Sequence, residues 1–215
     1  MLSKLREPVN GLTHLVAAAI ALVGLVILVV IGWEQSGKVI SLVIYGISLV
    51  TLFLASGLYH SVLATPRVVQ RLRKFDHSAI FLLIAGTYTP ICTNLLAGFW
   101  KWGLLGIVWG LALAGIGVKI FFINAPRWVT AGVYILMGWL SIFGIREMLV
   151  TMPVGAIIWL AAGGLIYTLG AVVYITKRMD FLPGVFGFHE VWHIFVILGA
   201  LAHFIMIATY VAPVP

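Results

Sequence analysis

Two histidines four residues apart open the last apolar stretch of the chain, in the sequence Phe188-His189-Glu190-Val191-Trp192-His193. On a helix, residues at this spacing lie about 40° apart around the axis and one turn apart along it, so both rings can face one metal ion. A catalytic zinc ion commonly takes three protein ligands and leaves a fourth position open. The pair therefore predicts part of a zinc site and requires a third ligand from elsewhere in the chain.

The composition identifies the class of protein in which that ligand must be sought. The 215 residues are 63% hydrophobic and 9% charged, with a mean hydropathy of +1.17. A water-soluble domain of this composition would expose large apolar surfaces. The single cysteine, Cys92, excludes an internal disulfide and a zinc site built from cysteines. We therefore expect an integral membrane protein.

Seven apolar segments each approach the roughly 20 residues that cross a hydrocarbon core of about 30 Å. Short breaks that contain Gly, Pro, Asn or charged residues separate them and leave no room for a second domain. We predict an all-α membrane protein, a single seven-helix bundle over residues 1–215. The helices are predicted at residues 12–32, 39–63, 78–98, 103–122, 129–146, 154–175 and 188–211.

Lys and Arg residues are distributed unevenly over the predicted loops. If the N-terminus is cytoplasmic, the outer side holds only Lys38, Lys101 and Arg146. This bias predicts a cytoplasmic N-terminus and a C-terminus outside. The net charge of +7 then reflects membrane orientation, and we expect no nucleic-acid binding because no basic run is interleaved with stacking aromatic residues. The inner side holds the other ten basic residues: Lys4, Arg6, Arg67, Arg71, Arg73, Lys74, Lys119, Arg127, Lys177 and Arg178.

This topology places a third histidine at the depth of the first two. The second segment runs inward, so His60 lies about one turn from the inner surface, and His189 and His193 occupy the first two turns of the seventh segment. Two further polar residues are expected at the same depth, near the inner surface. Asp76 begins the third segment after a predicted basic loop, and Ser56 lies one turn from His60 on the same helix face.

These residue types suit metal-assisted hydrolysis. Three neutral imidazoles leave the charge of a zinc ion uncancelled, so it can lower the pKa of a bound water to about 7. Asp76 would orient or deprotonate that water, and Ser56 would donate a hydrogen bond to Asp76 or to a substrate oxyanion. Because the site opens among apolar helices, we expect an amide or ester of a membrane lipid, with its acyl chain in the bundle.

Each assignment has a structural alternative. The histidines could be interfacial residues that are hydrogen-bonded to backbone or headgroups, Asp76 could be the N-cap of the third helix, and Ser56 could bond to its own helix. The remaining polar residues have their own predictions. Asn10 and His14 are expected beside the metal ligands or at the substrate mouth, Glu190 at the surface or paired with Arg178, and His203, about 15 Å deeper than His193, in contact with a neighbouring helix.

The Ser56-x-x-x-His60 pair, Asp76 and the His189-x-x-x-His193 pair resemble the signature of the progestin-and-adipoQ-receptor superfamily, and further segments resemble its bacterial hemolysin III branch. The resemblance spans nearly the whole chain. It implies a multi-pass protein of the bacterial inner membrane, with zinc bound by three histidines that are here His60, His189 and His193, and with Asp76 reaching the zinc through water. The superfamily is also similar to the alkaline ceramidases, which hydrolyse a lipid amide. The further segments are Asn10-Gly11-Leu12-Thr13-His14, Gly86-Thr87-Tyr88-Thr89-Pro90, Tyr134-Ile135-Leu136-Met137-Gly138-Trp139 and Leu182-Pro183-Gly184-Val185-Phe186-Gly187-Phe188-His189.

Two other classes of function stay open at this point. The branch name implies a pore-forming cytolysin or channel, in which zinc would only tie helices together. A b-type haem protein also uses helix histidines, but it needs rings that face each other across helices, whereas His189 and His193 share one face. Members of the branch have been linked to membrane lipid and energy homeostasis, which agrees with a zinc-dependent lipid hydrolase. The sequence specifies neither a substrate nor an oligomeric state.

Overall fold

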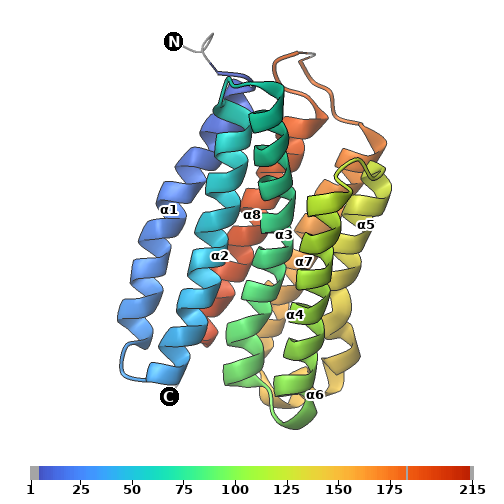
Figure 1. The fold of residues 1–215 in the computed structure, drawn as a ribbon. Coiled ribbons are helices and arrows are strands. Elements are labelled where there is room, and N and C mark those ends of the chain that lie inside the picture. Colours follow the sequence, from blue (N-terminus) through green and yellow to red (C-terminus); the bar gives the residue numbers. More distant parts are fainter. Residues whose placement is uncertain (1–4, 183, 214–215) are drawn as a thin grey trace.

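The computed structural model describes residues 5–182 and 184–213 (Figure 1). Lys4 and Pro183, which entered the sequence analysis, lie outside these ranges. Within the described chain, seven helical spans are long and apolar enough to cross a membrane, as predicted. The elements are α1 (Pro8–Gly32), α2 (Ser36–Ser61), α3 (Pro66–Leu95), α4 (Gly98–Phe121), α5 (Arg127–Gly138), the short 3-10 helix η2 (Trp139–Gly144), α6 (Ile145–Thr151), α7 (Val154–Thr176) and α8 (Phe188–Tyr210).

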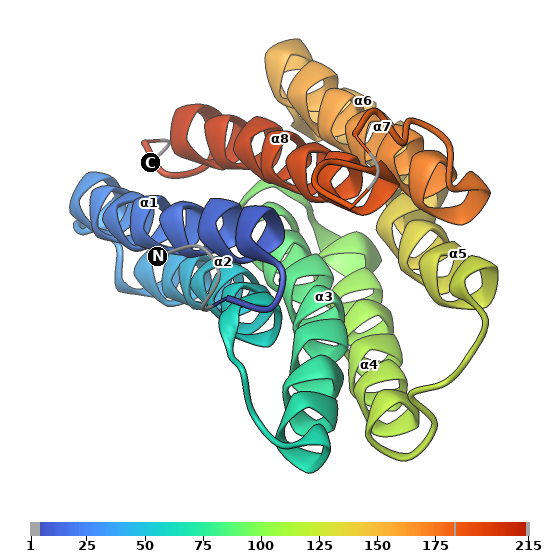
Figure 2. The ribbon, with the colours of Figure 1, turned by 90° about the horizontal axis from the view of Figure 1, so that it is seen from above.

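The helices run up and down in one bundle, and most pack against their neighbours in sequence (Figure 1). In the view along the bundle, α8 lies between α1 and α7, so the last helix closes the ring against the first (Figure 2). The beginning of α8 and the end of α2 therefore meet at the end of the bundle where α1 starts. We call this the histidine end.

The third helix is longer than the sequence predicts. It begins at Pro66 rather than at residue 78, and the expected basic loop at residues 71–74 is helical. Asp76 consequently lies within the helix, and the structural alternative in which it is the N-cap is wrong. Hydropathy locates only the part of a helix that crosses the membrane, whereas Arg and Lys are good helix formers and Pro66 suits a first turn.

The fifth predicted helix is interrupted. Instead of one helix over residues 129–146, the chain forms α5, the 3-10 helix η2 and α6, and it ends at Thr151. Backbone groups freed at such a break need partners within a membrane. The hydroxyl of Tyr88 on α3 supplies them: it donates to the carbonyl oxygen of Gly138 at 2.7 Å and accepts from the amide of Ser141 at 2.9 Å.

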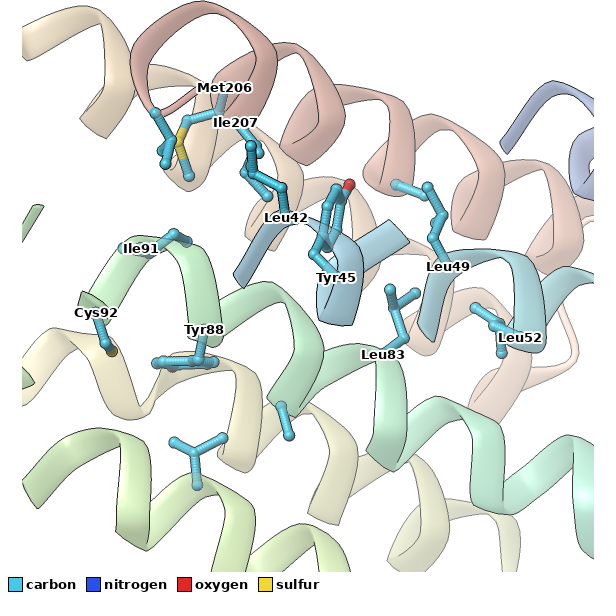
Figure 3. Packing of buried hydrophobic residues seen from close by; sticks show 14 of the residues in the cluster. Leu42, Tyr45, Leu49, Leu52, Leu83, Tyr88, Ile91, Cys92, Met206 and Ile207 are labelled. Carbon is cyan, nitrogen blue, oxygen red and sulfur yellow. The ribbon is translucent and has the colours of Figure 1, made fainter. Parts of the chain in front are cut away.

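The apolar core joins α2, α3 and α8 (Figure 3). Its side chains are almost completely shielded, and burial of each large aliphatic side chain contributes roughly 1.5–3 kcal/mol. Because the core fixes these three helices relative to one another, it also fixes the polar residues at their histidine ends. Prominent members of the core are Leu42, Tyr45, Leu49, Leu83, Ile91, Met206 and Ile207.

Candidate metal centre

Three histidines converge at the histidine end, as the matching depths predict. His60 ends α2, and His189 and His193 lie in the first two turns of α8; one ring nitrogen of each lies within 4.8 Å of those of the other two. The ring centroids are 4.7–5.1 Å apart. Zinc binds imidazole nitrogens at about 2.0–2.1 Å, so small rotations of the rings are enough to bring all three nitrogens onto one ion.

A carboxylate that the sequence analysis did not consider touches this cluster. Oε2 of Glu7, the residue before α1, lies 2.6 Å from Nδ1 of His60 and 3.9 Å from Nδ1 of His189. An ionised carboxylate only accepts hydrogen bonds, so Nδ1 of His60 carries the proton and Nε2 is free to bind a metal. Carboxylate–histidine–metal arrangements of this kind fix the ring and make it a stronger ligand.

The position of Glu7 is set by close packing of α1 against α2. The amide of Glu7 donates to the carbonyl oxygen of His60 at 2.9 Å, and the amide of Arg6 to that of Ser61 at 3.4 Å. A side chain at Gly11 would overlap the Ser61 hydroxyl, so glycine allows this approach. Partial burial alone would raise the pKa of Glu7, but hydrogen bonds from His60 and Asn10 outweigh it and lower that pKa to about 2.

Asn10 extends the network to the start of α8. It is fully buried, and its Nδ2 donates to Glu7 Oε2 at 3.2 Å and to Glu190 Oε1 at 2.8 Å. The other oxygen of Glu190 accepts the amide of Gly187 at 2.8 Å and so caps α8. The expectation that Glu190 lies at the surface or pairs with Arg178 is therefore wrong, because a buried amide and a helix N-terminus both require the carboxylate.

His14 lies beside the three converging histidines. Its ring centroid is 4.0 Å from that of His193, and its Nε2 is 3.4 Å from the carbonyl oxygen of His193. Nδ1 of His193 is buried and has no hydrogen-bond partner within the described residues. A buried nitrogen without a partner is costly, and a cation held by the neighbouring rings would relieve that cost. The donor set and its surroundings thus fit a metal ion.

Ser56 and Asp76 are also brought to the histidine end. Both side chains are buried, and both line an internal cavity together with His14, His189 and His193. Oδ2 of Asp76 lies 3.4 Å from Nδ1 of His77, a neighbouring residue that also lines the cavity and whose Nδ1 lies 2.9 Å from the Arg73 carbonyl oxygen. All five residues of the predicted constellation thus lie at one end of the bundle, with Asn10 and His14 beside them.

The cavity continues from the histidines into the bundle. Its volume is about 220 Å³, and most of its walls are apolar side chains of α3, α5 and α7. His203 lines its deeper part, and Nε2 of this residue lies 3.2 Å from the Leu160 carbonyl oxygen on α7, which confirms the predicted contact with a neighbouring helix. Ile142 and Ile145 line the cavity and are 55% and 39% exposed. The cavity therefore reaches the outer surface of the bundle at the broken helix.

Comparison with known proteins identifies the family. Residues 2–204 match the family model described as Haemolysin-III related. The chain is 36% identical to Hemolysin-3 of Bacillus cereus, over 96% of this chain and 92% of the relative. It is 35% identical to the Hemolysin-3 homolog of Bacillus subtilis, over 97% and 96%. A more distant relative, 29% identical over 83% of this chain and 71% of its own length, is the human Monocyte to macrophage differentiation factor. These matches agree with the resemblance given by the motifs, and this multi-pass membrane protein belongs to the haemolysin III family.

Proposed function

We propose that the protein is a zinc-dependent hydrolase of lipid amide or ester bonds in the bacterial cytoplasmic membrane, with the histidine end facing the cytoplasm. The observation that carries this proposal is the convergence of three histidine donors at one end of a long apolar cavity, with a buried carboxylate and a buried hydroxyl on the same cavity wall. Such an enzyme would act in membrane lipid homeostasis.

The donor set supports zinc over other metals. Magnesium and calcium prefer oxygen ligands, whereas three imidazoles with an open fourth position are typical of catalytic zinc. His60, His189 and His193 would hold the ion, and Glu7 would hold the His60 ring in the correct tautomer. When bound, zinc supplies a Lewis acid and a strong nucleophile at neutral pH.

Two residues of the cavity wall would perform the proton transfers of hydrolysis. The Asp76 carboxylate accepts a proton from the water that attacks the carbonyl carbon and returns it to the nitrogen or oxygen of the leaving group. The Ser56 hydroxyl donates a hydrogen bond to the carbonyl oxygen as negative charge develops on it. Breakage of the C–N or C–O bond then yields a fatty acid and an amine or alcohol.

The cavity supports a lipid as the substrate. A chain that enters at Ile142 and Ile145 can lie along apolar walls with its carbonyl group at the histidine end, at the level of the headgroups. Burial of the chain in this way fixes the scissile bond beside Asp76 and excludes water from the deeper cavity. Lipid substrates of this kind would reach the site sideways from the membrane.

The test is release of fatty acid from defined lipids by zinc-loaded protein reconstituted in vesicles. We expect cleavage of an acyl amide or acyl ester and no cleavage of an ether analogue of the same chain length. The same vesicles, loaded with a fluorescent dye, test for a pore. Dye release without fatty acid release would overturn the hydrolase and favour a pore-forming protein in which the metal has a structural role.

A further inference from the structure

A groove on the outside of the bundle, between α3 and α4, is separate from the metal centre. Its volume is about 400 Å³, and it lies at the histidine end. The α3 side of the groove is formed by residues 71, 74, 75, 78, 79 and 82, and the α4 side by Ile116 and Ile120. Steps of three and four residues keep these side chains on one face of each helix, so the groove runs along the helices.

The groove is basic at one end and mostly apolar along the rest of its length. Arg71 and Lys74 stand at the end of the groove nearest the start of α3, whereas Phe75, Leu82 and Ile116 are among the apolar residues that line the rest of it. From residue 71 to residue 82 the rise is about 16 Å. A ligand that fills the groove therefore needs a charged or polar head and an apolar tail.

The charge at the head of the groove is positive. Arg71 is exposed, and Nζ of Lys74 reaches across the groove to the Ile120 carbonyl oxygen at 2.5 Å, next to the end of α4. Arg67 and Arg73 lie on the same helical extension, and no acidic residue is among those that line the groove. Asp76 is buried on the other side of α3, at the central cavity.

We propose that this groove is a binding site for an anionic phospholipid. The phosphate lies against Arg71, whose planar guanidinium can bind two of its oxygens, and against Lys74. One acyl chain follows Phe75 and Ile116 toward Leu82. Basic pockets between helices at the cytoplasmic side of a membrane are typical sites for anionic headgroups. The proposal does not depend on hydrolysis at the metal centre, because the two sites lie on different faces of α3.

The test is lipid retention. Protein reconstituted with equal amounts of phosphatidylglycerol and phosphatidylcholine is released into detergent, and the lipids that stay bound are counted by native mass spectrometry. We expect the wild type to retain phosphatidylglycerol selectively. The double variant Arg71→Gln/Lys74→Gln should bind it about 30-fold more weakly, because each basic side chain near an anionic surface contributes roughly fivefold.

Three controls distinguish binding in the groove from general electrostatic attraction between basic side chains and anionic lipids. Lys177→Gln/Arg178→Gln removes the same charge at the same end of the bundle, just after α7 and away from the groove, and should leave retention within about twofold of wild type. Ser78→Phe fills the groove without changing charge, and should reduce retention of phosphatidylglycerol. Glycerol phosphate, a headgroup without chains, should not displace the lipid.

Several results would overturn the proposal. They are equal loss of selectivity in both double variants, undiminished retention by Ser78→Phe, displacement by glycerol phosphate, and no selectivity in the wild type. Thermal unfolding of each variant without added phosphatidylglycerol establishes that it is folded. If Arg71→Gln/Lys74→Gln does not fold, the Ser78→Phe variant and the wild-type selectivity decide the question.

Discussion

The helices that carry the polar centre differ from those that complete the cavity wall. In their most apolar windows, 56% of the residues of α2, 67% of α3 and 44% of α8 are buried inside the bundle, against 22% for α4 and 28% each for the α5–α6 span and α7. The first group supplies more than half of the buried core residues and holds His60, Asp76, His189 and His193. The second group contributes the 3-10 break and the exposed part of the cavity lining.

The two groups also differ in how their polar groups are satisfied. At the histidine end, Glu7, Asn10 and Glu190 link the starts of α1 and α8 to the end of α2 through several hydrogen bonds. At the broken helix, the hydroxyl of Tyr88 bridges Gly138 and Ser141, and the indole of Trp139 donates to Thr168 on α7. A metal centre needs donors held in fixed positions, whereas a wall through which a lipid enters must open. The denser hydrogen bonding at the histidine end therefore suits metal binding, and the sparser bonding at the broken helix suits entry of a lipid.

The largest effect is expected when the two histidines on α8 are replaced. His189→Ala/His193→Ala should abolish metal binding, from one zinc per chain to none, because a single histidine ligand remains. Metal analysis of detergent-purified protein, prepared without chelator, measures this directly. His203→Ala, in the deeper cavity, serves as the control and should retain the metal. A folded wild type without metal would exclude the zinc hydrolase.

Asp76→Asn separates chemistry from metal binding. Loss of a general base should lower kcat by about 10²- to 10⁴-fold, while zinc content stays at the wild-type level because Asp76 is not among the three converging histidines. Hydrolysis of the preferred lipid is measured beside metal content. Glu147→Gln, on α6, is the matched control and should leave both values unchanged. If Asp76→Asn loses metal and activity in parallel, Asp76 holds the ion instead of moving protons.

Glu7→Gln tests whether the charge of the Glu7 carboxylate makes His60 a stronger metal ligand. The amide oxygen of Gln still accepts the hydrogen of His60 Nδ1 but carries no charge, so the ring becomes a weaker ligand. Loss of such a partner typically weakens metal affinity about 10- to 100-fold. Competition with a chelator of known affinity measures the change, with Glu34→Gln, in the turn between α1 and α2, as the control. Unchanged affinity would show that close packing alone positions His60.

Much of this centre could be predicted because its residues lie on helices of known period and depth. His189 and His193 share a face whatever surrounds them, and the topology sets His60 at their level. Glu7 could not be found in the same way, because it precedes the first apolar segment and its contact with His60 spans 53 positions of sequence. The spacing of Glu7, Asn10 and His14 by three and four residues was a signal, since it is the period of one helix face.

Hydropathy alone also missed or misplaced some features of the fold. It showed only the membrane part of α3, so Asp76 was placed at the start of that helix. It gave no sign of η2, because Ser141 is the only polar residue there and the break is stabilised by Tyr88, which lies 50 positions from Gly138. Glu190 was assigned to the surface because its partner Asn10 lies 180 positions away. The errors at η2 and Glu190 each concern a contact between segments that are distant in sequence, whereas the error at α3 comes from charged residues that continue the helix beyond its apolar part.

The smallest expected effect is that of Tyr88→Phe, which leaves Gly138 and Ser141 without their partner. The unfolding free energy should fall by about 1–3 kcal/mol, the cost of unsatisfied buried polar groups, as measured by thermal or denaturant unfolding in detergent. Metal affinity should not change, because Tyr88 lies about 18 Å beyond Asp76 along α3. Tyr45→Phe is the matched control: its hydroxyl is buried without a partner in the described chain, so its removal should cost nothing. If Tyr88→Phe is equally neutral, the 3-10 break does not depend on that hydroxyl, and other contacts such as that of Trp139 with Thr168 hold the cavity wall.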